Sequence, residues 1–448
     1  MHRQHFTRGS IMQQSTHRRA LIPAAVAVAL MAWSHQASAA GFALFEQNAS
    51  GLGNAFAGAA AVAEDAGTIY FNPAGMTRIR GRQVVGAVSV IDVKIDFEND
   101  GRSTVPLGQI PGGGNGGDAG GTAGVPAGYL SRELKPNTLW LGVGVSAPFG
   151  LSTEWKNGWV GRFHALESSV EAININPSIA RKVNDQLSLG AGVSFQRLKA
   201  TFSNAVPYTA LAGSLRIPGV PIGSEGVAEV EGDSWDTGWN SGATRQVTPA
   251  TRLGLAYRSK VKHDVEGDVN FSARPAPLAR VVPDGDVKAK VELPDTLSLA
   301  VAHDVDARWQ LLADYTRTGW SSIEELAILR PTGRAVSRVD LAFEDSWRIA
   351  LGANYRMDDR WTLRFGFAYD RTPVQDAKRT PRLPDMDRKW LSVGTQYRAS
   401  QALAFDVGFT YIFSSDASSN LASASAGNLT GSYSNKTRVL GGQVRYTF

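Results

Sequence analysis

From position 403 the chain reads Leu403-Ala404-Phe405-Asp406-Val407-Gly408-Phe409-Thr410-Tyr411-Ile412-Phe413. Large apolar side chains occupy every second position from Leu403 to Phe413, and small or polar residues lie between most of them. Successive side chains of a β-strand point to opposite faces, so this period of two predicts a strand with one apolar and one polar face. Such a strand suits either a soluble sandwich or a barrel in a membrane.

The same alternation recurs along residues 347–355 and 361–369. The face opposite the apolar one carries Arg, Asp, Gln, Thr and Gly, which is typical of a polar lumen rather than of a second hydrophobic layer. An arginine that faces lipid at mid-depth costs roughly 2–4 kcal/mol. The arginines of this face therefore mark the inward side: Arg252, Arg348, Arg364 and Arg445.

Turn signals divide the alternating region into strands joined alternately by tight turns and by longer segments. This asymmetry is expected of bacterial barrels, and it predicts a transmembrane antiparallel β-barrel of about fourteen strands over residues 83–448. The final strand places Leu440, Val444 and Phe448 on one parity and ends in an aromatic residue. It resembles the last strand by which the barrel-insertion machinery recognises its clients.

Residues 1–39 are predicted to be a secretory signal peptide that is cleaved on export. Arginines precede an apolar run from Ala20 to Trp33, and Ala37-Ser38-Ala39 gives a small-residue cleavage pattern. Without the four arginines of this leader, 42 basic residues face 41 acidic ones, so no nucleic-acid partner is expected. The chain has no cysteine, which excludes disulfides and thiolate sites.

Residues 40–82 are too irregular for strands. They contain, in order, Ala40-Gly41-Phe42-Ala43-Leu44-Phe45-Glu46-Gln47, Gly51-Leu52-Gly53, Glu64-Asp65-Ala66-Gly67 and Asn72-Pro73-Ala74-Gly75-Met76. This order resembles the N-terminal hatch of the outer-membrane long-chain fatty acid transporters, a family that includes aromatic hydrocarbon transporters. The resemblance covers essentially all of the mature chain, and its later motifs are Gly232-Asp233-Ser234-Trp235, Tyr257-Arg258-Ser259 and Pro384-Asp385-Met386-Asp387-Arg388.

The resemblance implies that residues 40–82 plug the lumen. In the family the Asn-Pro-Ala element, here Asn72, Pro73 and Ala74, touches an inward kink in the third strand that opens the wall sideways. Here the third strand is predicted from Thr138 to about Ser146, and Pro148 follows it. Proline cannot donate to a strand ladder, so Pro148 is expected either to mark the kink or simply to end the strand.

Two further sets of residues receive roles from the resemblance. The apolar head formed by Phe42, Leu44 and Phe45 is expected to reach the internal binding pocket and to move when ligand arrives, unless it is only an anchor that fills the barrel. An apolar segment lies in the third outer loop, where the family places its capture groove; the alternative is a loop packed onto itself. Its residues are Val206, Tyr208, Leu211, Leu215 and Ile217.

The residues that would bind a carboxylate head group do not match a family motif. Arg197 and Lys199 are the candidates, because they follow, although imperfectly, the strand pattern of Gly190 and Gly192, which are predicted to face inward. No metal site and no cofactor are expected. Asp385 and Asp387 are predicted to remain solvated or to pair with Arg388 rather than to hold a cation.

The resemblance implies passive uptake of long-chain fatty acids or similar hydrophobic molecules. It places a multi-pass monomer in the outer membrane of a Gram-negative bacterium, surrounded by outer-membrane lipid and lipopolysaccharide. Uptake of aromatic or alkane hydrocarbons by the same architecture is the close alternative, and a general aqueous porin is another. Enzyme activity is not expected, because His263 and His303 are predicted far apart and no Gly-x-Ser-x-Gly motif is present.

Overall fold

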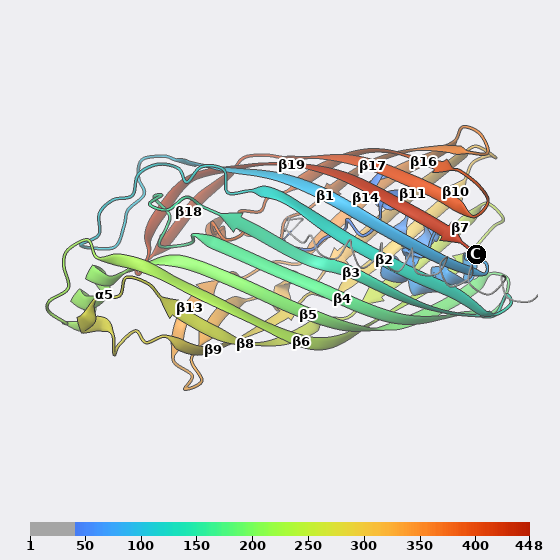
Figure 1. Cartoon of the computed structure of the whole chain (residues 1–448). Coiled ribbons are helices and arrows are strands. Elements are labelled where there is room, and N and C mark those ends of the chain that lie inside the picture. Colours follow the sequence, from blue (N-terminus) through green and yellow to red (C-terminus); the bar gives the residue numbers. More distant parts are fainter. Residues whose placement is uncertain (1–40) are drawn as a thin grey trace, which may run out of the picture.

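The computed structural model describes residues 41–448, and the predicted signal peptide lies outside the described residues. Its strands form one antiparallel sheet that closes into a long barrel (Figure 1). Closure is visible at β1 (Arg82–Asn99), which pairs with β2 (Gly121–Lys135) on one side and with β19 (Gly427–Thr447) on the other.

The wall contains nineteen strand segments, and five pairs of consecutive segments continue one another: β7 with β8, β9 with β10, β11 with β12, β13 with β14, and β17 with β18. Fourteen wall strands result, so the predicted barrel is confirmed. The other segments are β3 (Leu139–Glu154), β4 (Glu167–Lys182), β5 (Leu187–Pro207), β6 (Glu225–Gln246), β7 (Thr251–Arg258), β8 (Val261–Phe271), β9 (Gly285–Leu293), β10 (Thr296–Asp304), β11 (Trp309–Thr318), β12 (Glu325–Leu329), β13 (Ala335–Asp340), β14 (Ser346–Arg356), β15 (Trp361–Asp370), β16 (Arg388–Arg398), β17 (Leu403–Ser414) and β18 (Ala417–Ser423).

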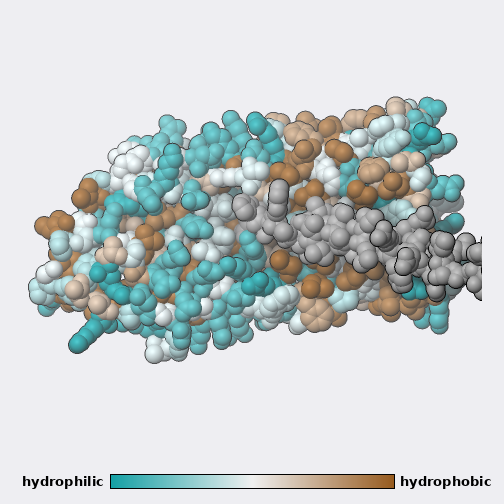
Figure 2. Space-filling model, viewed as in Figure 1, coloured by the Kyte–Doolittle hydropathy of each residue, from teal (hydrophilic) through white to brown (hydrophobic). Residues whose placement is uncertain are grey.

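The two faces of the wall follow the alternation of the sequence. In β17, Asp406 and Thr410 are buried inside, whereas Phe405 and Phe409 are exposed on the outer surface. In Figure 2, hydrophobic residues gather over the half of the barrel that carries the C-terminus, on the right. The half that carries the long loops, on the left, is mostly hydrophilic. None of the helices in residues 41–448 is long and apolar enough to cross a membrane.

The two ends of the barrel differ in their connections. Tight turns, among them residues 183–186, 305–308 and 357–360, lie at the end that carries the C-terminus (Figure 1). The long loops lie at the other end, where helix α5 (Tyr208–Leu215) and the short helices η2 (Ala276–Leu278) and η4 (Asp376–Lys378) occur in the outer connections. The short helix η3 (Trp320–Ser322) interrupts the wall strand that β11 and β12 form. In a bacterial barrel the tight turns face the periplasm.

Residues 41–81, here called the hatch, lie inside the barrel at its periplasmic half (Figure 1). The hatch comprises α2 (Ala49–Leu52), α3 (Ala59–Val62), α4 (Thr68–Phe71) and the 3-10 helix η1 (Pro73–Arg78). Helices this short are not stable alone, so they depend on contacts with the wall. Glycines of the wall allow that contact: a Cβ added at Gly366 would lie 2.1 Å from the carbonyl carbon of Asn54.

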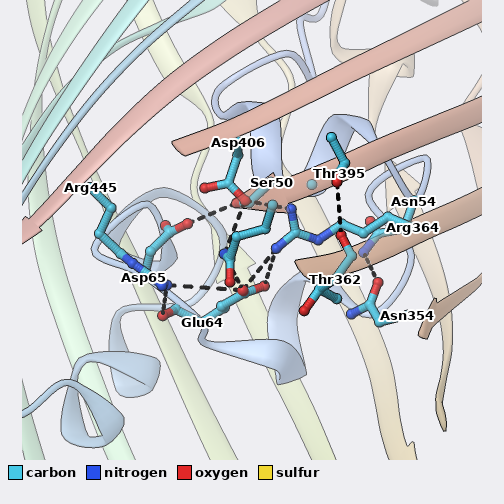
Figure 3. Close-up of polar contacts among 12 residues, drawn as sticks. Ser50, Asn54, Glu64, Asp65, Asn354, Thr362, Arg364, Thr395, Asp406 and Arg445 are labelled. Atoms are coloured by element: carbon cyan, nitrogen blue, oxygen red, sulfur yellow. Dashed lines mark hydrogen bonds and ion pairs between the residues drawn. The ribbon is translucent and has the colours of Figure 1, made fainter. Parts of the chain in front are cut away.

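A network of charged side chains ties the hatch to one side of the wall (Figure 3). Arg364 of β15 contacts Glu64 of the hatch at 2.8 Å and Asp406 of β17 at 2.5 Å, and Arg445 of β19 donates to the Glu64 carbonyl at 3.1 Å. Gln443 donates to Asp65, the next hatch residue, at 2.8 Å. Removing one partner of a buried ion pair costs about 3–5 kcal/mol, so this side of the hatch is firmly held.

Candidate functional site

The ladder between β2 and β3 stops partway up the wall. Pairing extends from the periplasmic turn to Gly128 opposite Val145, and beyond it residues 121–127 of β2 keep only their pairing with β1. The two chains meet again where the Glu154 amide donates to the Ala119 carbonyl at 3.0 Å. We call the unpaired stretch between residues 121–127 and 146–153 the wall gap.

Pro148 lies inside β3, at the wall gap. The register of β3 against β4 shifts between Ser146 and Phe149, and the strand then continues to Glu154. The expected strand end near Ser146 was therefore wrong. Proline has no N–H for the neighbouring strand, and here it forms part of a bulge that disrupts the ladder locally.

The first described residues of the chain lie along the free edge of β3. Ala43 forms an antiparallel bridge with Phe149, in which the Leu44 amide donates to the Pro148 carbonyl and the Gly150 amide donates to the Phe42 carbonyl, both at 2.8 Å. We call residues 41–47 the N-terminal segment. It satisfies backbone groups of β3 that β2 leaves unpaired, as buried backbone groups require.

Gln47 fills the next position along the same edge. Its side-chain amide donates to the Ala147 carbonyl at 2.7 Å, and its carbonyl oxygen accepts from the Ala147 amide at 3.2 Å. Tyr129 of β2 donates to the backbone carbonyl of Gln47 at 3.0 Å. The Gln47 side chain thus bonds to both the carbonyl and the amide of Ala147, as a neighbouring strand would. The sequence pattern did not reveal this contact.

Phe42 lies in an apolar cluster within the barrel. Its ring centroid is 4.9 Å from that of Trp320 and 5.7 Å from that of Phe149. Gly41 has a φ of +59°, and a Cβ there would lie 2.6 Å from Trp320, so this approach requires glycine. We call this cluster the apolar chamber; its other buried members are Leu151, Val170, Ala172, Leu198, Val265, Leu293, Ile323, Phe343, Val374 and Leu383.

Asp385 holds the beginning of the N-terminal segment. Its Oδ2 accepts from the Gly41 amide at 2.7 Å and from the Thr372 hydroxyl at 2.6 Å, while its Oδ1 forms an ion pair with Arg388. The expected pairing of Asp385 with Arg388 is present. Its contact with the N-terminal segment was not anticipated.

Glu46 brings an acidic group into the same interior. Burial raises the pKa of its carboxyl to about 7 against the opposing effect of Arg388 and Arg348. Its Oε2 accepts no hydrogen bond from any residue in the described part of the chain. An ionised Glu46 is therefore more stable when the N-terminal segment leaves its place and the carboxylate reaches water.

This burial predicts that the N-terminal segment leaves its place more easily at higher pH. The docked carboxyl has a pKa of about 7 and the released one about 4.5, so docking is strongest below pH 4.5. It weakens as pH rises to about 7, by up to roughly 3 kcal/mol. A neutral apolar fluorescent probe, which can replace Phe42 in the apolar chamber, is expected to bind more tightly at pH 8 than at pH 5. Glu46→Gln should remove most of this pH dependence; an equal pH dependence in the variant would contradict the assignment.

The structure places Asn72, Pro73 and Ala74 away from Pro148. The Asn72 side-chain amide donates to the Ala243 carbonyl at 3.1 Å and to the Leu255 carbonyl at 3.3 Å, on β6 and β7. Its Oδ1 accepts from the Ala74 amide and caps η1. The expected contact between this element and the kink was wrong, because Asn72 bonds to β6 and β7, three and four strands from β3, and the N-terminal segment takes the place at Pro148.

The expected carboxylate ligands Arg197 and Lys199 do not face the interior. Leu198 between them is buried, and they lie on the outer surface, paired with Asp233 at 3.1 Å and with Glu231 at 2.6 Å. Side chains alternate strictly along β5, and the inward position of Leu198 directs both neighbours outward. The predicted inward direction of Arg197 and Lys199 was therefore wrong, because the inward position belongs to Leu198 between them.

The third outer loop is packed partly onto itself and partly against the next outer loop. Tyr208 is fully buried, and Val206, Leu211 and Ile217 pack with it against Leu278 of another loop. Of the predicted capture residues only Leu215 is exposed. Exposed apolar side chains nearby come from two loops: Leu107, Ile110, Leu215 and Ile222.

Arg382 is a buried cation at the outer side of the apolar chamber. It donates to Ser168 and Asn204 at 3.1 Å and contacts the Phe202 ring at 5.4 Å. Burial lowers the pKa of Arg382 to about 10, so the guanidinium is charged at neutral pH. Among residues 41–448 it differs from the buried arginines that form ion pairs with carboxylates: Arg162, Arg348, Arg364, Arg379 and Arg388.

Known proteins resemble this chain over nearly its whole length. A family model described as Outer membrane protein transport protein (OMPP1/FadL/TodX) matches residues 29–448. The long-chain fatty acid transport protein of Escherichia coli O6:H1 is 31% identical over 408 residues, which cover 87% of this chain and 90% of that protein.

Solved structures resemble the barrel as well. A Pseudomonas aeruginosa FadL homologue has a TM-score of 0.84 at 28% identity, covering 91% of this chain and 100% of the other. The Ralstonia pickettii toluene transporter TbuX has a TM-score of 0.63 at 21% identity, covering 90% and 100%, and shares the fold.

Proposed function

This chain belongs to the outer membrane protein transport protein family, and we propose that it takes up long-chain fatty acids across the outer membrane of a Gram-negative bacterium. Members of this family transport hydrophobic compounds. The observation that carries the mechanism is the N-terminal segment, which covers the free edge of β3 and also places Phe42 in the apolar chamber. One displacement would therefore empty the chamber and expose the wall gap together.

Capture begins, in this proposal, at the exposed apolar side chains of the outer loops. Leu107 and Ile222 are 91% and 88% exposed, and exposed apolar groups of this kind are typical of binding surfaces. From there the acyl chain moves into the apolar chamber. The Asn72 element keeps the rest of the hatch against the wall, and residues 40–82 act as the plug.

Displacement of Phe42 is energetically accessible to a long acyl chain. Burial of a methylene contributes about 0.8 kcal/mol, so a sixteen-carbon chain supplies on the order of 12 kcal/mol before costs. Full burial of a phenylalanine side chain contributes about 1.5–3 kcal/mol. Cargo then leaves sideways through the wall gap near Pro148 into the membrane, which spares the acyl chain a passage through water.

A fatty acid is favoured over a neutral hydrocarbon by Arg382. Only neutral acceptors surround this guanidinium among the described residues, so a carboxylate at the outer side of the chamber would supply the missing negative charge. A charged hydrogen bond contributes about 1.5–3 kcal/mol, less than the acyl chain. Hydrocarbon uptake, the activity named for the fold relative TbuX, is the second candidate.

Competition between unlike cargoes tests the assignment. Palmitate, decane and toluene are added to the purified protein with a bound fluorescent fatty acid. Palmitate is expected to displace it at the lowest concentration, since it alone combines a long apolar chain with a carboxylate. Displacement by toluene ahead of palmitate would transfer the function to hydrocarbon uptake.

Arg382→Gln refines the same measurement. Palmitate affinity is expected to fall by about tenfold to a hundredfold while decane affinity stays within about twofold, because only the charged contact is lost. The matched control is Arg197→Gln, on the outer surface, which should change neither affinity. An equal loss for palmitate and decane would indicate a general disturbance of the chamber.

The proposal treats one barrel as the working unit, in contact with outer-membrane lipid and lipopolysaccharide and delivered there by the barrel-insertion machinery. A general aqueous porin is disfavoured by the hatch, whose residues Glu64 and Asn54 contact side chains from the wall strands β14 and β15. Such a plug suits a transporter of hydrophobic molecules better than an open water-filled pore.

A further inference from the structure

A cavity lies at the periplasmic end of the barrel, on the far side of the hatch from the apolar chamber. Its volume is about 560 Å³, and its lining combines hatch residues with residues of the tight turns. Hatch residues Glu64 and Arg78 line one side, and Asp304, Asp358 and Arg360 line the other. No step of the proposed uptake route uses this space.

Basic side chains predominate in the lining. Six arginines face four carboxylates there: Arg78, Arg252, Arg308, Arg356, Arg360 and Arg398 against Glu64, Asp304, Asp358 and Asp359. Three of the carboxylates are already engaged. Glu64 binds Arg364, Asp304 binds Arg356 at 3.2 Å, and Asp358 accepts from two backbone amides of its own turn.

Arg252, which lines this cavity, is a buried arginine with N–H groups that lack acceptors in the part of the chain that the structure describes. The residue is only 6% exposed, yet its Nε and Nη1 have no hydrogen-bond partner among residues 41–448. Arg78 of the hatch is close enough to Arg252 for their charges to repel, and Asp304 offsets this repulsion in part. Two like charges, one on the hatch and one on the wall, thus flank a space in which two buried N–H donors of Arg252 have no acceptor among residues 41–448.

We propose that this cavity binds an oxyanion, a phosphate or carboxylate group, between Arg252 of β7 and Arg78 of the hatch. Guanidinium groups bind such anions with two parallel hydrogen bonds, and a bridging anion would replace repulsion across the cavity by attraction on both sides. Because Arg78 belongs to η1 and Arg252 to the wall, occupancy would hold the periplasmic side of the hatch in place. The site is separate from the apolar chamber and takes a different chemical class of ligand.

Calorimetric titration of the full-length purified protein tests the site with three probes: inorganic phosphate, acetate and dihexanoyl phosphatidic acid. The wild-type protein is expected to bind at least one of them, and the preferred probe identifies free phosphate, a carboxylate or a lipid head group as the source. Arg252→Gln should weaken that binding at least tenfold, and Arg252→Lys, which keeps the charge, should weaken it less. Absence of binding by all three probes, or equal binding by Arg252→Gln, would overturn the proposal.

Limited trypsin digestion provides a second readout that does not depend on transport. Arg78 and Arg80 are exposed trypsin sites at the end of the hatch. The bound anion is expected to slow cleavage there in the wild-type protein and not in Arg252→Gln, while Arg197→Gln behaves as wild type. Heat-modifiable migration of the barrel on gels confirms that each variant is folded. Cleavage that is indifferent to the anion in the wild-type protein would remove the hatch from the proposal, and palmitate binding should be unaffected in either case.

Discussion

Oxidation of a double variant, Ala43→Cys with Phe149→Cys, is expected to reduce fatty acid uptake at least tenfold. The two positions form the antiparallel bridge between the N-terminal segment and β3, and the hydrogen bonds lie on the flanking residues. Residues in such a non-hydrogen-bonded pair have Cα atoms about 4.5 Å apart, within the range that disulfides span. The crosslink would fix the N-terminal segment over the wall gap and keep Phe42 in the apolar chamber.

The chain is well suited to this experiment because it contains no cysteine of its own. Uptake is measured in cells before and after reduction, and the reduced double variant is the internal control for the loss of the Phe149 ring. Ala43→Cys alone controls for the thiol. Full uptake by the oxidised protein would show that cargo passes without movement of the N-terminal segment.

Deletion of residues 40–45 is expected to strengthen the binding of a fatty acid. The deletion removes Phe42 from the chamber, along with the backbone bonds to Pro148 and Gly150. Cargo then no longer competes with a phenylalanine side chain, whose burial contributes about 1.5–3 kcal/mol. Affinity for a fluorescent fatty acid should rise by roughly tenfold to a hundredfold, since each 1.4 kcal/mol corresponds to about tenfold.

The barrel itself should tolerate this truncation. The ties between the hatch and the wall at Glu64, Asp65 and Asn72 all lie outside the deleted residues. The thermal transition of the barrel is therefore expected to stay close to that of the wild-type protein, although uptake changes. Unchanged affinity and unchanged uptake in the truncated protein would show that Phe42 and Leu44 are only an anchor.

The wall could be predicted from the sequence because its physics is local. A strand in lipid must alternate, so the parity of Phe405 and Asp406 is enough to assign inside and outside. Tight turns carry their own residue signals, and the number of strands follows from them. The same parity, applied to Gly190 and Leu198, also directs Arg197 and Lys199 outward.

The contacts of the hatch could not be predicted in this way. Gln47 meets Ala147 across one hundred residues of sequence, and Gly41 meets Asp385 across 344. No periodicity links such positions, and the resemblance assigned the kink to Asn72 instead. Trp320 and Arg382 were missed for a similar reason. Trp320 lies where the wall strand breaks between β11 and β12, and Arg382 lies in the outer connection between β15 and β16. At neither place does alternation or a turn signal indicate which side chains enter the barrel.

The hatch is attached to the wall by ion pairs on one side and by hydrogen bonds at the N-terminal segment. This difference bears on how an outer membrane remains impermeable during uptake. Arg364 and Arg445 fasten one side of the hatch to β15 and β19, and the N-terminal segment meets β3 through backbone and side-chain hydrogen bonds. In the proposed route, a fatty acid would be admitted by withdrawal of residues 41–47 alone, while the rest of the hatch stays bound to the wall. The cell would then gain a hydrophobic nutrient without opening a leak for water, ions or antibiotics.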